Sequence, residues 1–208
     1  MKKFEDPYEE LEHIAGSRAE RVLPVLQEAA EAFEAGRERD ALRLIRPIVK
    51  RYPSAQGVQE LFGMSLYANG KYKEALPVLE EFTSRTKSFD QLPLIMDCYR
   101  SMGRFEKVDA LWKELGDVSP DGAVTAEGRI VHSQSLAEQG KIEEALRLLR
   151  KKVKPIGRPK AHHLRLWYCL ADLEERAGNV IAARQWFERL KNQNPDFADI
   201  QDRVKALS

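Results

Sequence analysis

Residues 62–82 read FGMSLYANGKYKEALPVLEEF and contain the pattern from which the fold can be worked out. It fits two amphipathic helices joined by a short turn at residues 69–71. In the second helix, Ala75, Leu79 and Phe82 recur at i, i+4 and i+7, which is the spacing of one helical stripe. Gly70 supplies a left-handed turn conformation that other residues adopt at a steric cost. Such a hairpin cannot bury its apolar face alone, so the fold depends on whether the pattern recurs.

The pattern recurs along the chain. Turn glycines stand at Gly36, Gly70, Gly103, Gly140 and Gly178, so successive units are 34, 33, 37 and 38 residues apart. Five residues after each glycine comes a small or short side chain: Ala41, Ala75, Val108, Ala145 and Ala183. Four residues further on comes a large apolar one: Ile45, Leu79, Trp112, Leu149 and Phe187. Three beyond these stand Ile48, Phe82, Leu115, Lys152 and Leu190, where only Lys152 breaks the rule. This regularity predicts a tandem array of helical hairpins.

These five units resemble the tetratricopeptide repeat over residues 22–195. The fifth unit carries much of the match, with Trp167, Leu170, Ala171, Gly178, Ala183, Phe187 and Pro195. The first unit departs from the pattern at Glu28, and the fourth has His132 and Ser133 in place of the usual apolar and glycine pair. The resemblance implies an all-α, right-handed superhelix of about five helical hairpins, in a single solenoid domain over residues 1–208.

Extra helices are expected at both ends of the array. Asp6 before Pro7 is a good helix start, so residues 1–16 are assigned to an N-terminal capping helix. Ser17 and Glu20 have capping-box spacing and predict the start of the next helix. Pro24 either kinks one long helix or opens a new one near Leu23, and the sequence leaves both readings open. Residues 196–208 combine one apolar stripe with polar positions, as a C-terminal capping helix requires.

Turn residues fill two longer connections, at residues 116–122 and residues 154–159. They explain the two longest intervals between turn glycines. Both segments are therefore expected to be loops.

Composition limits the function classes. A formal net charge of +1 argues against a uniformly basic nucleic-acid binder, and no apolar run is long enough for a transmembrane helix. The chain turns acidic at Glu5 and Asp6, where a signal peptide would turn apolar. Cys98 and Cys169 are the only two cysteines in the sequence, so we expect no disulfide. A protein with so few cysteines is expected in the cytoplasm. No catalytic, metal or cofactor motif is present in the sequence, which favours a protein that is not an enzyme.

The resemblance places a ligand groove along the first helix of each repeat. By registration on Glu60, Met64 and Tyr67, the groove would contain Leu26, Phe33, Glu60, Met64, Tyr67, Asp97, Arg100, Ile130, Gln134, Tyr168 and Asp172. A peptide or protein partner is expected there, with Tyr67 and Met64 as anchors. The alternative is that the N-terminal helix or the curvature of the superhelix fills part of this surface.

A basic stretch is the second candidate site. It contains Arg147, Arg150, Lys151, Lys152, Lys154, Arg158, Lys160 and Arg165, and no acid occurs between Ala145 and Ala171. The plain interpretation is that these cations complement the dipole of a helix that ends near Val153. The functional interpretation is a contact with an acidic protein or with nucleic acid.

The sequence therefore predicts a non-enzymatic interaction module or adaptor that binds a protein or peptide along the groove. A regulator that contacts nucleic acid or another polyanion through residues 147–165 is the alternative. Self-association stays open, and no membrane partner, metal or cofactor is expected.

Overall fold

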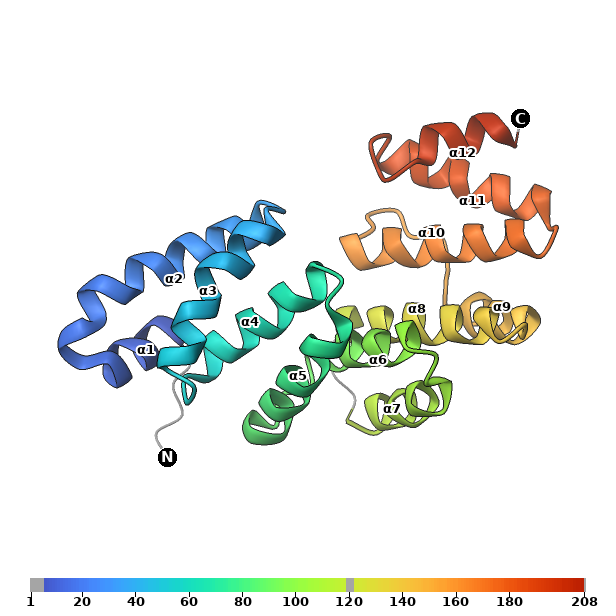
Figure 1. Ribbon diagram of the computed structural model, residues 1–208. Helices are drawn as coiled ribbons and strands as arrows, with labels where there is room; N and C mark the ends of the chain where they lie inside the picture. The colour runs from blue at the N-terminus through green and yellow to red at the C-terminus, as the bar shows by residue number, and fades with distance from the viewer. Residues whose placement is uncertain (1–5, 119–121, 208) are drawn as a thin grey trace. The chain divides into compact units, whose positions relative to one another are not determined.

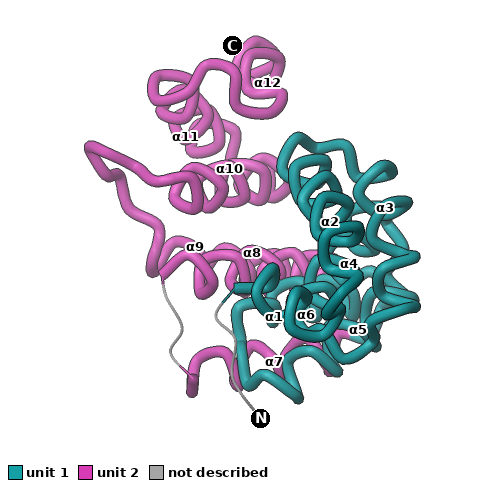
Figure 2. The backbone as a smooth tube through the Cα atoms, turned by 90° about the vertical axis from the view of Figure 1, so that its left-hand side faces the viewer, with its two compact units in different colours: residues 1–104 teal, residues 105–208 magenta. Residues whose placement is uncertain are grey.

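The computed structural model describes residues 6–118 and 122–207, and every regular element in these two ranges is a helix. The expected all-α solenoid of helical hairpins is confirmed. The chain divides into two compact units, residues 1–104 and residues 105–208 (Figure 2). Whether the two form the single domain expected from the sequence stays a prediction.

The first unit contains α1 (Pro7–Ala15), a short 3-10 turn (Gly16–Arg18), α2 (Ala19–Glu34), α3 (Glu38–Arg51), α4 (Gln56–Ala68), α5 (Tyr72–Thr86) and α6 (Leu92–Ser101) (Figure 1). The pairs α2–α3 and α4–α5 are the first two hairpins, and α3 packs on α4. Helix α1 packs on α2 and on α4 rather than on α3.

The second unit contains α7 (Phe105–Val118), α8 (Gly122–Glu138), α9 (Ile142–Arg150), α10 (Ala161–Arg176), α11 (Val180–Gln193) and α12 (Ile200–Ala206). Here α8–α9 and α10–α11 form the hairpins. Helix α10 packs on α8 and α9, and α12 packs on α11.

The repeat register follows the sequence pattern. All five turn glycines have positive φ, from 68° at Gly36 to 81° at Gly178. The five small positions that follow them are fully buried, because two helices meet there. Helices α4 and α5 come close together at Gly63, where an added Cβ would stand 2.6 Å from Leu79 Cδ2. Helices α4 and α5 therefore pack through a glycine, which explains why a larger residue is absent at this position.

Lys152, the exception in the pattern, has a simple explanation. Helix α9 ends at Arg150, so Lys152 lies beyond the helix and is exposed. Val153 turns inward instead and is 6% exposed. The buried position is thus retained in space but shifted by one residue in sequence.

The N-terminal predictions are confirmed in part. Asp6 caps α1, since its Oδ1 accepts a hydrogen bond of 2.7 Å from the backbone nitrogen of Tyr8. The capping box at Ser17 is wrong, because residues 16–18 form the 3-10 turn and α2 starts at Ala19 without a side-chain cap. Pro24 lies inside α2, which runs from Ala19 to Glu34 as one helix.

Two other segment boundaries are corrected. The loop expected at residues 116–122 is wrong at both ends, since α7 continues through Gly116 to Val118 and α8 begins at Gly122; residues 119–121 lie outside the described residues. The C-terminal helix begins at Ile200 rather than directly after Pro195. Phe197 lies in the turn before it and packs on the core of the second unit.

Candidate partner-binding surfaces

Three residues of the expected groove form one network in the first unit. The hydroxyl of Tyr67 on α4 donates to Asp97 Oδ2 on α6 at 2.8 Å, and Arg100 Nε donates to Asp97 Oδ1 at 2.7 Å. Asp97 is only 7% exposed, whereas Tyr67 and Arg100 are half-buried. Burial, followed by the charge of Asp97, raises the pKa of Tyr67, so this phenol stays protonated and keeps donating.

The other expected groove residues of this unit divide into two kinds. Phe33, Glu60 and Met64 are half-buried and therefore keep accessible surface. Glu60 Oε1 accepts a hydrogen bond of 2.8 Å from Gln91, and burial raises the pKa of Glu60. Leu26, in contrast, is 2% exposed and belongs to the core, so its assignment to a ligand-contacting surface is corrected.

In the second unit, the α10 face is occupied by the chain's own C-terminal segment. Tyr168 donates to Asp199 Oδ1 at 2.5 Å; burial, followed by this hydrogen bond, raises the pKa of Tyr168 to about 12. Arg203 of α12 pairs with Asp172, and its guanidinium lies 6.0 Å from the Tyr168 ring centroid. Tyr168 and Asp172 are therefore engaged by the C-terminal segment. Ile130 packs on the core of this unit.

Gln134 on α8 is half-buried. Tyr168 and Asp172 are half-buried as well, and they differ from Gln134 in that the C-terminal segment engages both of them.

All eight residues of the basic stretch are exposed, but two of them are neutralised. Arg150 pairs with Glu174 through two hydrogen bonds of 2.7 and 2.5 Å, and Arg165 Nε lies 2.6 Å from Glu127 Oε1. Both carboxylates come from outside the stretch, so this pairing was not visible in the sequence pattern. The remaining six cations form no ion pair with the described residues.

A cavity of about 360 Å³ adjoins this stretch. It is lined by Gly122, Thr125, Ala126, Arg129, Lys152, Val153, Lys154, Ile156, His162, His163, Leu166 and Trp167, with no acid among these residues. Arg129 Nε is buried without a hydrogen-bond partner among the described residues, and its guanidinium lies 5.4 Å from the Trp112 ring centroid. Burial lowers the pKa of Arg129. The lining therefore suits a negatively charged group.

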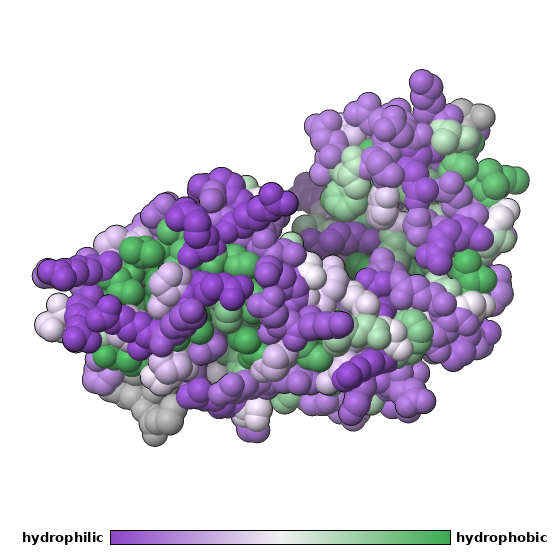
Figure 3. Space-filling model, viewed as in Figure 1, coloured by the Kyte–Doolittle hydropathy of each residue, from purple (hydrophilic) through white to green (hydrophobic). Residues whose placement is uncertain are grey.

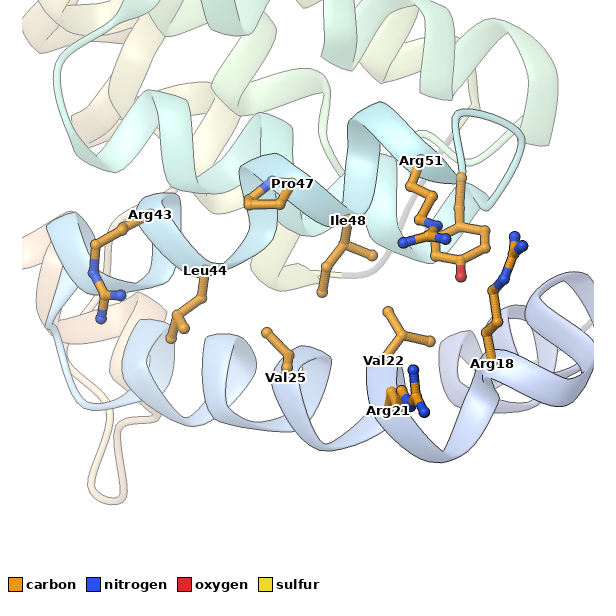
Figure 4. Close-up of a pocket in the computed structure, with 10 residues that line it drawn as sticks. Arg18, Arg21, Val22, Val25, Arg43, Leu44, Pro47, Ile48 and Arg51 are labelled. Carbon is orange, nitrogen blue, oxygen red and sulfur yellow. The ribbon is translucent and has the colours of Figure 1, made fainter.

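The sequence reasoning missed a groove between α2 and α3, with a volume of about 400 Å³. It is lined by Arg18, Arg21, Val22, Val25, Arg43, Leu44, Pro47, Ile48, Arg51 and Tyr52 (Figure 4). Over α2 and α3, apolar surface lies between strongly hydrophilic side chains (Figure 3). The available signal was the spacing of arginines on two consecutive helices, which gains meaning only once the helices pair.

The described residues include no group of three or more histidines, cysteines or acids arranged to hold a metal ion. No helix in the described ranges has the length and apolar character needed to cross a bilayer.

Comparison with known proteins agrees with this architecture. The tetratricopeptide repeat family model matches residues 26–89 and 131–197, which is more than half of the chain. No curated protein sequence matches the chain.

Solved structures share the fold at low sequence identity. TTC0263, a thermophilic TPR protein of Thermus thermophilus, has a TM-score of 0.73 at 17% identity, with 89% of this chain and 98% of that chain covered. A putative kinesin light chain of Podosopora anserina with nearly identical TPR-like repeats has a TM-score of 0.58 at 16% identity, with 97% and 99% covered. YrrB, a TPR protein with an unusual peptide-binding site, has a TM-score of 0.54 at 15% identity, with 93% and 96% covered. Because this family model matches more than half of the chain, over residues 26–89 and 131–197, the chain belongs to the tetratricopeptide repeat family.

Proposed function

We propose that this chain is a non-enzymatic interaction module that binds a peptide or protein on the first-helix face of the first unit. We define this face by Phe33, Glu60, Met64, Tyr67 and Arg100. The observation that carries the proposal is the hydrogen-bonded network of Tyr67, Asp97 and Arg100. The nearly buried Asp97 fixes both neighbours, so a partner meets side chains that are already ordered and loses less conformational entropy on binding.

The residue types on this face favour recognition of a peptide. Tyrosine and arginine are over-represented among residues that carry binding energy at interfaces, and methionine adapts its shape to different apolar side chains. The peptide-binding site of YrrB, a protein of the same fold, is consistent with such a role. Cys98 and Cys169 are buried free cysteines, which agrees with the reducing cytoplasm that we propose as the location.

The test compares three immobilised forms of the full chain in a native lysate: wild type, Tyr67→Ala with Met64→Ala, and Glu81→Ala. Glu81 is exposed on α5, so its variant is the control. Quantitative mass spectrometry should show a partner that the double variant loses and the control keeps. Calorimetry with that partner should then show a loss of about 1–2 kcal/mol for Tyr67→Ala alone. Equal capture by all three forms, or unchanged affinity, would contradict a binding role for this face.

A second candidate function is contact with a polyanion through the basic stretch. It is favoured by the cavity without acidic lining beside Lys152 and Lys154. Anisotropy with a short labelled DNA duplex should then show affinity that falls steeply between about 50 and about 200 mM salt. Charge reversal at Arg158 and Lys160 should abolish the binding. If binding is weak and insensitive to these reversals, the six cations that form no ion pair with the described residues are only helix-end and loop charges.

A further inference from the structure

The groove between α2 and α3 combines an apolar floor with cationic ends. Val22 and Val25 of α2 face Leu44, Pro47 and Ile48 of α3 across it (Figure 4). The cations stand at both ends: Arg43 at one, and Arg18, Arg21 and Arg51 at the other (Figure 4). Its volume of about 400 Å³ lies in the range of ligand sites, roughly 300–1,000 Å³.

The second repeat supplies an internal reference for this groove. The matching positions, 34 residues later, are Gln56, Gln59, Val78, Glu81, Phe82 and Arg85, and these six line a space of only about 10 Å³ between α4 and α5. Glutamines replace Val22 and Val25, and Glu81 replaces Pro47 and pairs with Arg85 at 3.4 Å. The repeat fold therefore does not itself require an open, apolar and cationic groove at this place. The first repeat therefore differs from the second in the volume of this space and in the types of residue that line it.

The charge of the groove is only partly balanced within the chain. Arg43 lies 3.7 Å from Asp40, which also lies near Arg37. Arg18, Arg21 and Arg51 form no ion pair with any described residue, and none of the ten lining residues is acidic. Three guanidinium groups at the end of an apolar floor repel one another. An anionic partner would relieve that repulsion.

We propose that this groove is a docking site for an acidic, amphipathic peptide segment. Large apolar side chains of the segment pack on Val22, Val25, Leu44 and Ile48, and its carboxylates pair with Arg18, Arg21 and Arg51. The planar guanidinium binds a carboxylate through two parallel hydrogen bonds, which favours arginine over lysine in this role. This site lies outside the first-helix face proposed above and does not depend on it.

The placement of the charges favours a peptide over other anionic partners. A lipid carries its charge at one end of an apolar chain, so it would reach only the cluster of Arg18, Arg21 and Arg51 and would leave Arg43, at the other end, with Asp40 alone among the described residues (Figure 4). Duplex DNA presents phosphates but no apolar side chains for the floor, and its binding is dominated by many backbone contacts. An amphipathic segment presents apolar and charged groups at helical spacing along its length.

The experiment uses random peptides of about 16 residues displayed on phage, each roughly 24 Å long when helical, and selects them on the full chain. The variant Arg21→Glu with Arg51→Glu serves for counter-selection. Enriched peptides should be acidic, with large apolar residues at i and i+4. The affinity of the best labelled peptide should fall at least about tenfold in Arg51→Gln.

The matched control is Arg85→Gln, which changes the equivalent arginine one repeat later and should leave the affinity unchanged. Tyr67→Ala should also have no effect, since it tests the other face. Circular dichroism checks that each variant is folded. Three results would overturn the proposal: a selected pool without acidic enrichment, equal losses in Arg51→Gln and Arg85→Gln, or binding sensitive to Tyr67→Ala but not to Arg51→Gln. Binding of duplex DNA or anionic vesicles that requires Arg51, without acidic-peptide binding, would also overturn it and assign the groove to that partner instead.

Discussion

Arg150 on α9 donates two parallel hydrogen bonds to the carboxylate of Glu174 on α10, with Nε–Oε1 at 2.7 Å and Nη2–Oε2 at 2.5 Å. The Glu174 side chain is 3% exposed, whereas that of Arg150 is 46% exposed. Asn179 Nδ2 donates to the same carboxylate at 2.9 Å. The pair joins the fourth and fifth repeats, and it raises the pKa of Arg150. A residue that the sequence grouped with a basic patch thus has a structural role.

Replacing Arg150 with alanine should destabilise the protein because it leaves the buried carboxylate of Glu174 without its cation. We expect a loss of about 1.5–3 kcal/mol, at the lower end if water reaches the exposed side of the pair. The control is Arg147→Ala, since Arg147 is exposed and unpaired among the described residues; it should change stability by less than about 0.5 kcal/mol. Chemical denaturation measures both, and equal effects would contradict a structural role for the pair.

Two helical glycines should respond to alanine in opposite directions. At Gly63 the new Cβ would meet Leu79 Cδ2 at 2.6 Å, so Gly63→Ala should destabilise by about 1–3 kcal/mol through overpacking. At Gly116, inside α7, no atom of the described residues beyond the local helix backbone lies within 4 Å of the new Cβ. There the better helix propensity of alanine should stabilise by about 0.5–1 kcal/mol. Thermal unfolding that shows no destabilisation by Gly63→Ala would refute the close packing of α4 on α5, and destabilisation by Gly116→Ala would contradict the open site at Gly116.

His132 should make stability fall on acidification. Its ring stacks on Trp112 and its Nε2 lies 3.0 Å from Asp109 Oδ1, but burial outweighs this carboxylate and lowers the pKa of His132 below the usual 6.5. As pH falls through 6.5, the unfolded chain therefore takes up a proton that the folded protein does not, and folding is disfavoured. His132→Phe keeps an aromatic ring and removes this difference.

The free energy of unfolding should therefore drop less in His132→Phe than in wild type between about pH 7.5 and about pH 5.5. Denaturation at several pH values in that range provides the measurement. Parallel curves for the two proteins would show that His132 does not contribute to the pH dependence.

The two cysteines should react slowly with thiol reagents in the native state. Burial raises the pKa of Cys169 to about 11, and burial with nearby Asp97 and Glu80 raises the pKa of Cys98 to about 12. The thiolate is the reactive form, so both groups are protected by protonation as well as by packing. Labelling with a maleimide near neutral pH should be much faster in denaturant than without it. Rapid labelling of Cys169 in the folded protein would contradict its place in the core.

The register of the repeats follows from the amino-acid sequence alone. The glycines from Gly36 to Gly178, the small positions such as Ala75 and the stripe ending in Phe82 are set by helical periodicity and by the steric freedom of glycine. Helical periodicity and the freedom of glycine both apply within a single hairpin, so they can be recognised in the sequence without knowing which other helices pack on that hairpin. The end of α9 and the start of α2 were not readable in this way. Lys152 broke the repeat pattern because α9 ends at Arg150, and Ser17 fitted a capping-box spacing but lies in a 3-10 turn before α2.

The tertiary structure alone decided which side chains share a site. Registration on the repeat family placed Leu26 on a ligand face, but the packing of α2 made it core. Asp97 accepts a hydrogen bond from Tyr67, Glu174 pairs with Arg150, and the guanidinium of Arg203 lies over the ring of Tyr168. In each contact the two residues are 24 or more positions apart in the sequence. The groove between α2 and α3 likewise arises where two helices meet. The sequence pattern of a helix fixes the direction in which each side chain leaves the helix axis. The contacts above depend instead on the distance and angle between two helices, which the sequence of one helix does not set.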